Sequence, residues 1–225
     1  MHDELRLNRR EALVAAGVAG VGAAAYGLRG LWLPNDAEAA SCVLQREVTE
    51  GPYYLDLDLV RRNIRGGRPG TPLTLRFKVV DATTCKPIKG ATVELWHADA
   101  SGVYSGVQGN SGNFLRGGQR TDANGNVRFE TIVPGWYRGR TPHIHMKVFV
   151  SGNEIHTGQV FFQPATTRKV YAQGAYRSRG NADTANSADA IYRDAGARAL
   201  VPLTRKGKLI GSGFNGRMTV GVRAS

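Results

Sequence analysis

The stretch LTLRFKVV at residues 73–80 decides the fold class, because its apolar and polar side chains alternate. Every odd-numbered residue from 73 to 79 is apolar, whereas positions 74, 76 and 78 carry Thr, Arg and Lys. Successive side chains of a β-strand point to opposite faces, so this alternation is typical of a strand with one buried face and one solvated face. The stretch therefore predicts a half-buried strand.

Further short strands are expected on both sides of this stretch. They combine β-branched and aromatic residues with flanking turns rich in Gly, Asn, Asp and Pro. Together they predict an all-β fold, an antiparallel β-sandwich with long loops at one end. The further strands are expected at residues 91–97, 127–132, 143–150, 157–163, 209–214 and 218–222.

Two segments interrupt this pattern. Residues 105–119 are rich in Gly, Ser and Asn, which predicts a surface loop over one end of the sheets. Residues 165–200 are dominated by Ala, Arg, Asp and Ser without clear alternation, which predicts a short irregular and helical C-terminal insertion. No internal repeat or interdomain linker is present, so we expect one folded domain.

The N-terminal segment has the composition of an export signal. Arg9 and Arg10 precede an uncharged Ala/Gly/Val stretch at residues 12–28, and Ala-Glu-Ala at residues 37–39 matches a small-x-small cleavage site. We interpret residues 1–39 as a twin-arginine-type signal peptide and residues 40–225 as the folded domain, exported to an extracellular, periplasmic or cell-envelope location.

The alternative is that the signal is retained as a single membrane anchor, the one membrane contact that the sequence suggests. An apolar stretch of about 17 residues lies at the lower limit for crossing a bilayer. The high Gly and Ala content makes this stretch only weakly hydrophobic, which favours cleavage.

The sequence is strongly basic, with a formal net charge of +12. Residues 1–39 hold four Lys or Arg and five Asp or Glu, so 26 basic and 13 acidic residues belong to the predicted domain. Such a surface suits nucleic acid, an anionic cell envelope or anionic substrates. Because no Lys/Arg block is interleaved with aromatic residues, we expect no nucleic-acid partner.

The two cysteines, Cys42 and Cys85, form an even count in a chain with an export signal, which predicts a disulfide between them. The alternative is two independent free thiols. Neither cysteine belongs to a CxxC pair, which argues against a redox-active or metal-ligating role.

His143 and His145 stand two residues apart in a predicted strand, so both imidazoles project from one face and can reach one metal ion. Such a pair is also typical of a polar, solvent-facing strand. Tyr104 and Tyr137 precede it on predicted loops, although each could be an ordinary core residue with its hydroxyl at the rim. Two phenolates beside two imidazoles favour a hard trivalent ion over zinc, which points to iron(III).

Three groups of residues form a recognisable pattern. They are TEGPYY at residues 49–54, VELWHAD at residues 93–99 leading to Tyr104, and PGWY at residues 134–137 followed by RTPHIH at residues 140–145. In these motifs the chain resembles the intradiol ring-cleavage dioxygenases, which include catechol 1,2- and protocatechuate 3,4-dioxygenases. The resemblance runs through most of residues 41–222, and the last two groups are specific in order and spacing.

The resemblance implies a non-haem iron(III) cofactor and a set of residues for each role. The positions that match the family's metal ligands are Tyr104, Tyr137, His143 and His145. The positions expected at the substrate are Gly51, Tyr53 and Arg140. The positions expected to act in catalysis are Arg140, Tyr137 and Gln159.

The implied reaction uses O2 to open a catechol-type ring between its two hydroxylated carbons, which gives a muconate-type product. Tyr137 would serve in turn as ligand and base, Arg140 would stabilise anionic charge, and Gln159 would orient a pocket group or water. Arg138 and Gly139 depart from the classical oligomeric branches, so contacts to ring substituents do not carry over. The chain is most similar to the exported, compact branch of the family.

A binding module without catalysis is the alternative. Residues 87–93 and 121–137 also resemble transthyretin-like and carboxypeptidase-regulatory-type sandwiches, which need no metal and could bind cell-wall polyanions or glycans. The RxxHxH element with Tyr at both expected offsets favours the dioxygenase. Of the two remaining histidines in the domain, we expect His97 to be a hydrogen-bonded structural residue and His156 to be solvated in a turn.

Overall fold

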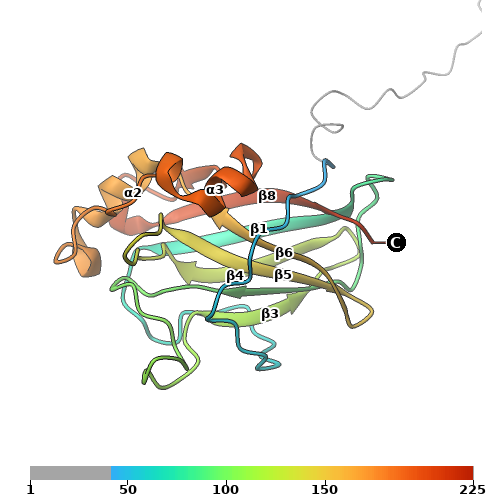
Figure 1. The fold of residues 1–225 in the computed structure, drawn as a ribbon, viewed down its shortest axis with the longest axis horizontal. Helices are drawn as coiled ribbons and strands as arrows, with labels where there is room; N and C mark the ends of the chain where they lie inside the picture. Colours follow the sequence, from blue (N-terminus) through green and yellow to red (C-terminus); the bar gives the residue numbers. More distant parts are fainter. Residues whose placement is uncertain (1–41, 225) are drawn as a thin grey trace, which may run out of the picture. The chain divides into compact units, whose positions relative to one another are not determined.

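Figure 1 shows the chain as a computed structural model, and the structure describes residues 42–224. The predicted signal peptide, residues 1–39, lies outside the described residues. Two four-stranded sheets form the described domain, which confirms the predicted all-β sandwich. In this part of the chain, no helix has the length and apolar character needed to span a bilayer.

The two sheets differ in their strand order. The first sheet runs β4-β1-β8-β7 and the second runs β3-β2-β5-β6. All strand pairs are antiparallel except β1 and β8, which are parallel. The strands of the first sheet are β1 (Pro72–Asp81), β4 (Asn126–Ile132), β7 (Leu203–Arg205) and β8 (Phe214–Val222). Those of the second are β2 (Thr92–Trp96), β3 (Arg116–Arg120), β5 (His143–Val150) and β6 (Asn153–Phe161).

The core lies between the sheets and is filled by the alternating apolar residues of their strands. On β1 the predicted odd-numbered face is buried, as Leu75 and Val79 show with no exposed surface. Ile144 and Val148 of β5 are equally buried and belong to the same apolar cluster. Each fully buried side chain of this size contributes about 1.5–3 kcal/mol. The even-numbered residues of β1 and the odd-numbered residues of β5 therefore lie on the outer faces of the sandwich.

The predicted helical insertion is present between β6 and β7. Pro164 stands at the first position of α2, where its missing N–H leaves no hydrogen bond unmade. The helix α3 packs against β6, where the rings of Phe161 and Tyr192 lie 5.2 Å apart. The helices are α2 (Pro164–Tyr171) and α3 (Ala190–Ala195), with short 3-10 turns η1 (Gly174–Tyr176), η2 (Asn186–Ala188), η3 (Ala197–Ala199) and, after β7, η4 (Ile210–Ser212).

One loop prediction and one strand prediction are wrong. The end of the predicted loop at residues 105–119 is the start of β3, where a side chain at Gly117 would collide with Ile64 and Arg61. Glycine at this position lets β3 pass close to residues 61–64. Because glycine has no side chain, the strand shows no alternation of apolar and polar residues in the sequence. In place of the predicted strand at residues 209–214 the chain forms the turn η4. Leu209, which precedes this turn, is 74% exposed, and β8 begins only at Phe214.

The two histidines outside the HxH pair differ in outcome. His97 is buried and forms hydrogen bonds with the Ala98 carbonyl at 2.8 Å and Thr131 Oγ1 at 2.7 Å, which confirms its structural role. The prediction that His156 is solvated is wrong, because β6 begins at Asn153 and pairs His156 with Val148 of β5. His156 is only 1% exposed, and burial lowers its pKa.

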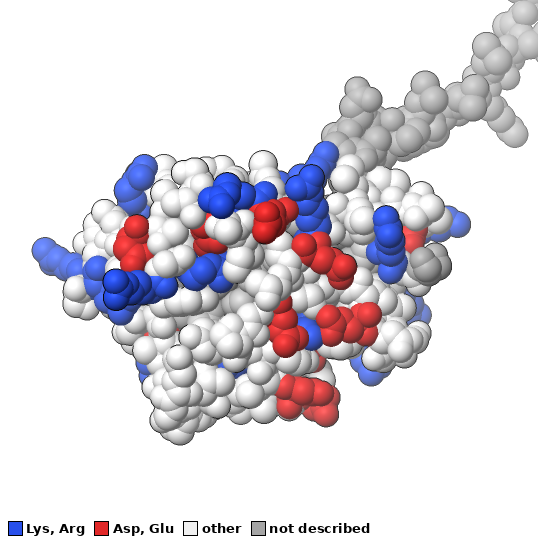
Figure 2. Space-filling view, in the orientation of Figure 1, with Lys and Arg blue, Asp and Glu red and all other residues white. Residues whose placement is uncertain are grey.

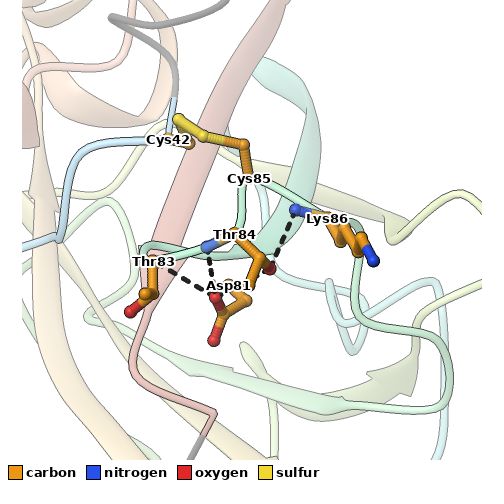
Figure 3. The surroundings of a disulfide bond; sticks show 6 residues. All are labelled: Cys42, Asp81, Thr83, Thr84, Cys85 and Lys86. Carbon is orange, nitrogen blue, oxygen red and sulfur yellow. Dashed lines mark hydrogen bonds between the residues drawn. A yellow bond between two sulfur atoms is a disulfide. The ribbon is translucent and has the colours of Figure 1, made fainter.

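A disulfide joins Cys42 to Cys85, as predicted. Figure 3 shows the turn that carries Cys85, in which Asp81 Oδ1 accepts hydrogen bonds from the backbone N–H groups of Thr83 at 3.0 Å and Thr84 at 2.7 Å. Cys85 has a φ of 58°, a left-handed conformation that is uncommon for residues other than glycine. The carboxylate of Asp81 therefore stabilises the turn from which Cys85 reaches Cys42.

Replacing both cysteines with Ser should lower the free energy of unfolding by about 3–4 kcal/mol, since the bridge restricts the unfolded chain across a separation of 43 residues. Urea denaturation of the oxidised wild type and the Cys42→Ser/Cys85→Ser variant measures the difference. Wild type unfolded in reducing buffer is the control and should behave like the variant. Identical midpoints for all three samples would contradict the prediction.

Candidate metal centre

The two histidines of the HxH pair project from the outer face of the second sheet. β5 pairs with β2 so that His145 lies directly opposite Trp96. The indole of Trp96 stacks on the imidazole of His145, with 4.9 Å between ring centroids and 11° between planes. His143 and His145 are 3% and 1% exposed, so this part of the outer face is covered rather than solvated.

Tyr104 reaches the histidines from the connection that follows β2. Asp99 Oδ1 accepts hydrogen bonds from the N–H groups of Ser101 at 2.8 Å and Val103 at 3.1 Å, and its other oxygen pairs with Arg68. Gly102 has a φ of 81°, and a Cβ there would lie 2.3 Å from the carbonyl oxygen of Trp136. This tight turn directs Tyr104 inward, where it is 2% exposed.

Tyr137 comes from the loop that enters β5. The loop is attached to the insertion, because the Tyr171 hydroxyl donates to the carbonyl of Pro134 at 2.8 Å and Trp136 Nε1 donates to the carbonyl of Gly180 at 3.0 Å. The N–H of Arg140 donates to the carbonyl of Tyr137 at 3.1 Å and closes a turn before the strand. Tyr137 is half-buried, so it is the most open member of the cluster.

Four polar atoms converge at this point. His143 Nε2 lies 3.1 Å from His145 Nε2, 3.2 Å from Tyr137 Oη and 3.5 Å from Tyr104 Oη. Tyr104 Oη is also 3.1 Å from His145 Nε2. Atoms bound to one first-row metal ion at about 2 Å must lie roughly 3 Å apart. The sequence-predicted ligands are therefore brought together at separations that suit a single ion.

The protonation of the histidines also suits a cation. His143 Nδ1 lies 2.7 Å from the carbonyl oxygen of Thr141, which can only accept, so the ring proton is assigned to Nδ1 and Nε2 presents a lone pair. The buried Nδ1 of His145 has no hydrogen-bond partner among residues 42–224. In the same residues, no group of three or more His, Cys, Asp and Glu side chains could hold a metal, so this candidate depends on its tyrosines.

Burial keeps the cluster neutral. Burial and the charge of Arg140 lower the pKa of His143 to about 3, and burial with the neighbouring His143 lowers that of His145. Burial raises the pKa of Tyr104 well above its ordinary value. It also raises the pKa of Tyr137, although Arg140 acts in the opposite direction. A bound cation would reverse the shift for the phenols, because it stabilises the phenolate.

Arg140 is held beside the cluster by groups from three segments. Its Nε donates to Asp189 Oδ2 at 2.8 Å, and its Nη2 donates to Gln159 Oε1 at 2.6 Å. Gln159 Nε2 in turn donates to the carbonyl of Thr49 at 3.0 Å. The remaining nitrogen, Nη1, lies 3.3 Å from Tyr137 Oη. The guanidinium is thus preorganised with one edge toward the cluster.

The predicted substrate residues Gly51 and Tyr53 lie over the same site. Gly51 has a φ of 76°, and a Cβ there would approach His145 Cε1 to 3.2 Å, so the chain passes directly above that imidazole. The ring of Tyr53 lies 4.6 Å from the ring of Tyr104 and 6.0 Å from that of Tyr137. Its hydroxyl accepts a hydrogen bond from Gln108 at 3.1 Å and therefore does not join the cluster.

Three contributors were not predicted from the sequence. Asp189 is buried, and its Oδ2 accepts the hydrogen bond from Arg140. Its Oδ1 caps α3 by accepting hydrogen bonds from the N–H groups of Ile191 at 2.9 Å and Tyr192 at 3.2 Å. An Asp before a helix signals an N-cap, but nothing local signals its second partner. Trp96 orients His145 by stacking. Arg116, at the start of β3, donates to the carbonyls of Tyr53 at 2.7 Å and Ser105 at 2.7 Å and so ties two site loops together.

Comparison with known proteins adds independent findings. The family model described as Dioxygenase matches residues 49–179. Among solved structures, an intradiol ring-cleavage dioxygenase from Tetranychus urticae is similar with a TM-score of 0.76 at 35% identity, and the match covers 82% of this chain and 97% of that one.

Curated relatives match over shorter stretches. The chlorocatechol 1,2-dioxygenase of Pseudomonas putida is 29% identical over 136 residues, which are 51% of this chain and 52% of the relative. The protocatechuate 3,4-dioxygenase beta chain of Burkholderia cepacia is 36% identical over 109 residues, which are 42% of this chain and 46% of the relative. The chain thus spans about half the length of the curated relatives it matches.

Replacing Asp189 with Ala should lower the free energy of unfolding by about 2–4 kcal/mol, because it removes a helix cap and leaves a half-buried guanidinium without its carboxylate. Asp194→Ala is the matched control, since Asp194 lies exposed on the same helix. It should change stability by less than about 0.5 kcal/mol. Chemical denaturation measures both values, and equal losses in the two variants would refute the role assigned to Asp189.

Proposed function

The chain belongs to the intradiol ring-cleavage dioxygenase family, and we propose that it is an active non-haem iron(III) dioxygenase that opens catechol-type rings with O2. The products would be muconate-type dicarboxylates. The observation that supports this proposal most directly is the convergence of two phenol oxygens and two imidazole nitrogens beside a fixed guanidinium. A sandwich that only bound polymers would gain nothing from burying these groups together.

Tyr104, Tyr137, His143 and His145 would hold the iron. Phenolate oxygen is a hard donor that suits a trivalent ion, and both imidazoles are neutral with Nε2 directed at the cluster. When bound, iron(III) would act as a Lewis acid toward the two hydroxyl oxygens of a catechol. All other contributions come from the side chains around it.

Tyr137 would accept a proton from a hydroxyl group of the substrate. It is the half-buried tyrosine of the pair, and Arg140 opposes the rise in pKa that burial causes. Its Oη is less enclosed than that of Tyr104, so it is the phenol oxygen that an incoming substrate hydroxyl can reach more easily. In this proposal Tyr137 would be a ligand of the resting iron, and its Oη would take up a proton from a substrate hydroxyl.

Arg140 would stabilise negative charge on the deprotonated substrate. Asp189 and Gln159 fix the orientation of its guanidinium before the substrate arrives. A charge that is already in place needs no reorganisation as the anion develops, which is the most effective form of electrostatic catalysis. Gln159 would act as a positioning residue, since it connects Arg140 to the segment that carries Gly51.

Gly51 and Tyr53 would form the wall opposite the metal. The absence of a side chain at Gly51 leaves room beside His145, and the ring of Tyr53 offers an aromatic face next to both ligand tyrosines. An aromatic substrate could pack against that ring edge-on or in offset stacking. The half-buried environment would limit the access of water to the reacting ring.

We also propose that the domain is exported by the twin-arginine route. The signal-like residues 1–39 suggest the route, and the disulfide between Cys42 and Cys85 supports an oxidising compartment, because such bonds rarely persist in a reducing cytosol. A route that carries folded proteins would allow the metal to be bound before export.

Purified protein should be red to brown, because iron(III) bound by phenolates absorbs visible light through charge transfer. Tyr104→Phe should lower iron affinity at least about tenfold, since even outer-shell partners of metal ligands contribute about 10–100-fold. Tyr53→Phe is the control, because the Tyr53 hydroxyl bonds Gln108 instead of the cluster. Metal analysis and visible spectra test this, and a colourless protein that binds only zinc would eliminate the proposed cofactor.

Arg140→Ala should retain iron and colour but lower kcat on catechol about 100-fold, which corresponds to about 3 kcal/mol of lost charge stabilisation. Arg138→Ala removes an exposed arginine two residues earlier and should keep kcat within about twofold of wild type. Steady-state kinetics at equal iron content separate the two variants. A kcat for Arg140→Ala within twofold of wild type would exclude the catalytic role.

A further inference from the structure

A row of arginines crosses the outer face of the first sheet, whereas the candidate metal centre lies on the outer face of the second sheet. Arg76 of β1 lies directly opposite Arg128 of β4 on one side and Arg217 of β8 on the other. The residues before and after each of the three are buried, so all three side chains point away from the core. We refer to Arg76, Arg128 and Arg217 as the basic row.

The basic row lies in a groove of about 650 Å³ whose other charged walls are also mostly positive. Arg62, Lys78 and Arg120 line it, and Asp122 is its only acidic lining residue. Asp122 already accepts hydrogen bonds from the N–H groups of its own turn.

Little of this charge is neutralised within the protein. Arg128 pairs with Glu130 at 2.8 Å. Within residues 42–224, no carboxylate forms an ion pair with Arg76, Lys78 or Arg217. The groove therefore presents several unpaired cations to one occupant.

Folding alone does not explain this arrangement. Like charges directly opposite each other on neighbouring strands destabilise a sheet, and here the repulsion occurs on both sides of Arg76. Of the acidic residues that the structure describes, only two lie at this face, Asp122 in the groove lining and Glu130 beside Arg128. Figure 2 shows Asp and Glu side chains gathered over β5 and β6, where Lys147 pairs with Glu50 and Glu154. The groove therefore holds more positive than negative charge, and its unpaired cations are available to an anionic partner.

We propose that the basic row is a docking surface for an anionic polysaccharide that carries a carboxylate on each sugar, a polyuronate. The planar guanidinium of arginine matches a carboxylate through two parallel hydrogen bonds. Neighbouring strands lie about 4.8 Å apart, so the row offers three such groups at regular intervals over about 10 Å. A polymer with regularly repeated carboxylates can engage them together, whereas a single small anion can engage only one or two.

The same face is poorly suited to other polyanions. Single-stranded nucleic acid is bound through aromatic side chains that stack on bases. The only aromatic residue that lines this groove, Phe77, is 1% exposed and belongs to the core. Basic residues alone attract anionic lipids, but stable membrane binding also draws on apolar side chains that enter the headgroup region. None of the large hydrophobic residues that are exposed in the described chain lines the groove.

The test compares binding of wild type and an Arg76→Gln/Arg217→Gln variant to polygalacturonate at low ionic strength. Arg168→Gln/Arg177→Gln is the matched control, because it removes two exposed arginines of the insertion and changes the net charge equally. Neutral dextran, single-stranded DNA and phosphatidylglycerol vesicles are the comparison ligands. Thermal unfolding checks each variant, and the first variant should be no less stable than wild type because repulsion is removed.

We expect wild type and the control to bind polygalacturonate equally within twofold, while the Arg76→Gln/Arg217→Gln variant binds at least about tenfold more weakly. Dextran should not bind. Unchanged binding by the variant would overturn the proposal, and an equal loss in the control would reduce it to an effect of net charge. Tighter binding of DNA or vesicles that depends on Arg76 and Arg217 would assign the face to a different partner. None of these readouts requires iron or ring cleavage.

Discussion

The register of β5 between β2 and β6 is the constraint on which the site depends. In this register Ile144, Met146 and Val148 enter the core, and His143 and His145 emerge together on the opposite face. A slip of one residue would exchange the two sets, burying the imidazoles in the apolar core and exposing the aliphatic side chains. The hydrophobic core therefore selects the only pairing in which the two imidazoles can meet the tyrosines.

Local patterns in the sequence were sufficient for part of this arrangement. The alternation at residues 73–80 identified β1, and the spacing of His143 and His145 placed both on one face. The spacing could not tell whether that face was solvated, because the answer depends on which distant segments cover it. Gly51 crosses above His145, and Gln159 bonds Thr49. Neither contact leaves a periodic signal in the sequence.

Three features of the structure were missed in the sequence, each for its own physical reason. β3 contains two adjacent glycines, of which Gly117 lies against Arg61 and Ile64, so close approach of the backbone replaced the side-chain alternation that identifies strands. His156 was assigned to a turn because Gly152 and Asn153 are typical turn residues, yet the strand resumes immediately after them. Asp189 was missed because its second partner is distant in the sequence. An Asp before a helix can be recognised as an N-cap, but the hydrogen bond from Arg140 to Asp189 joins residues 49 positions apart.

The parallel pairing of β1 and β8 has a consequence for the timing of folding. β8 lies between β1 and β7 within its sheet, so most of the chain must be synthesised before the sheet can close. Contacts of such large sequence separation form slowly, because a long loop must be ordered first. Until residues 214–222 have left the ribosome, β1 has an open edge with unpaired backbone groups, which favours aggregation. The edge of β1 that β8 covers is therefore paired only once almost all of the described chain is available.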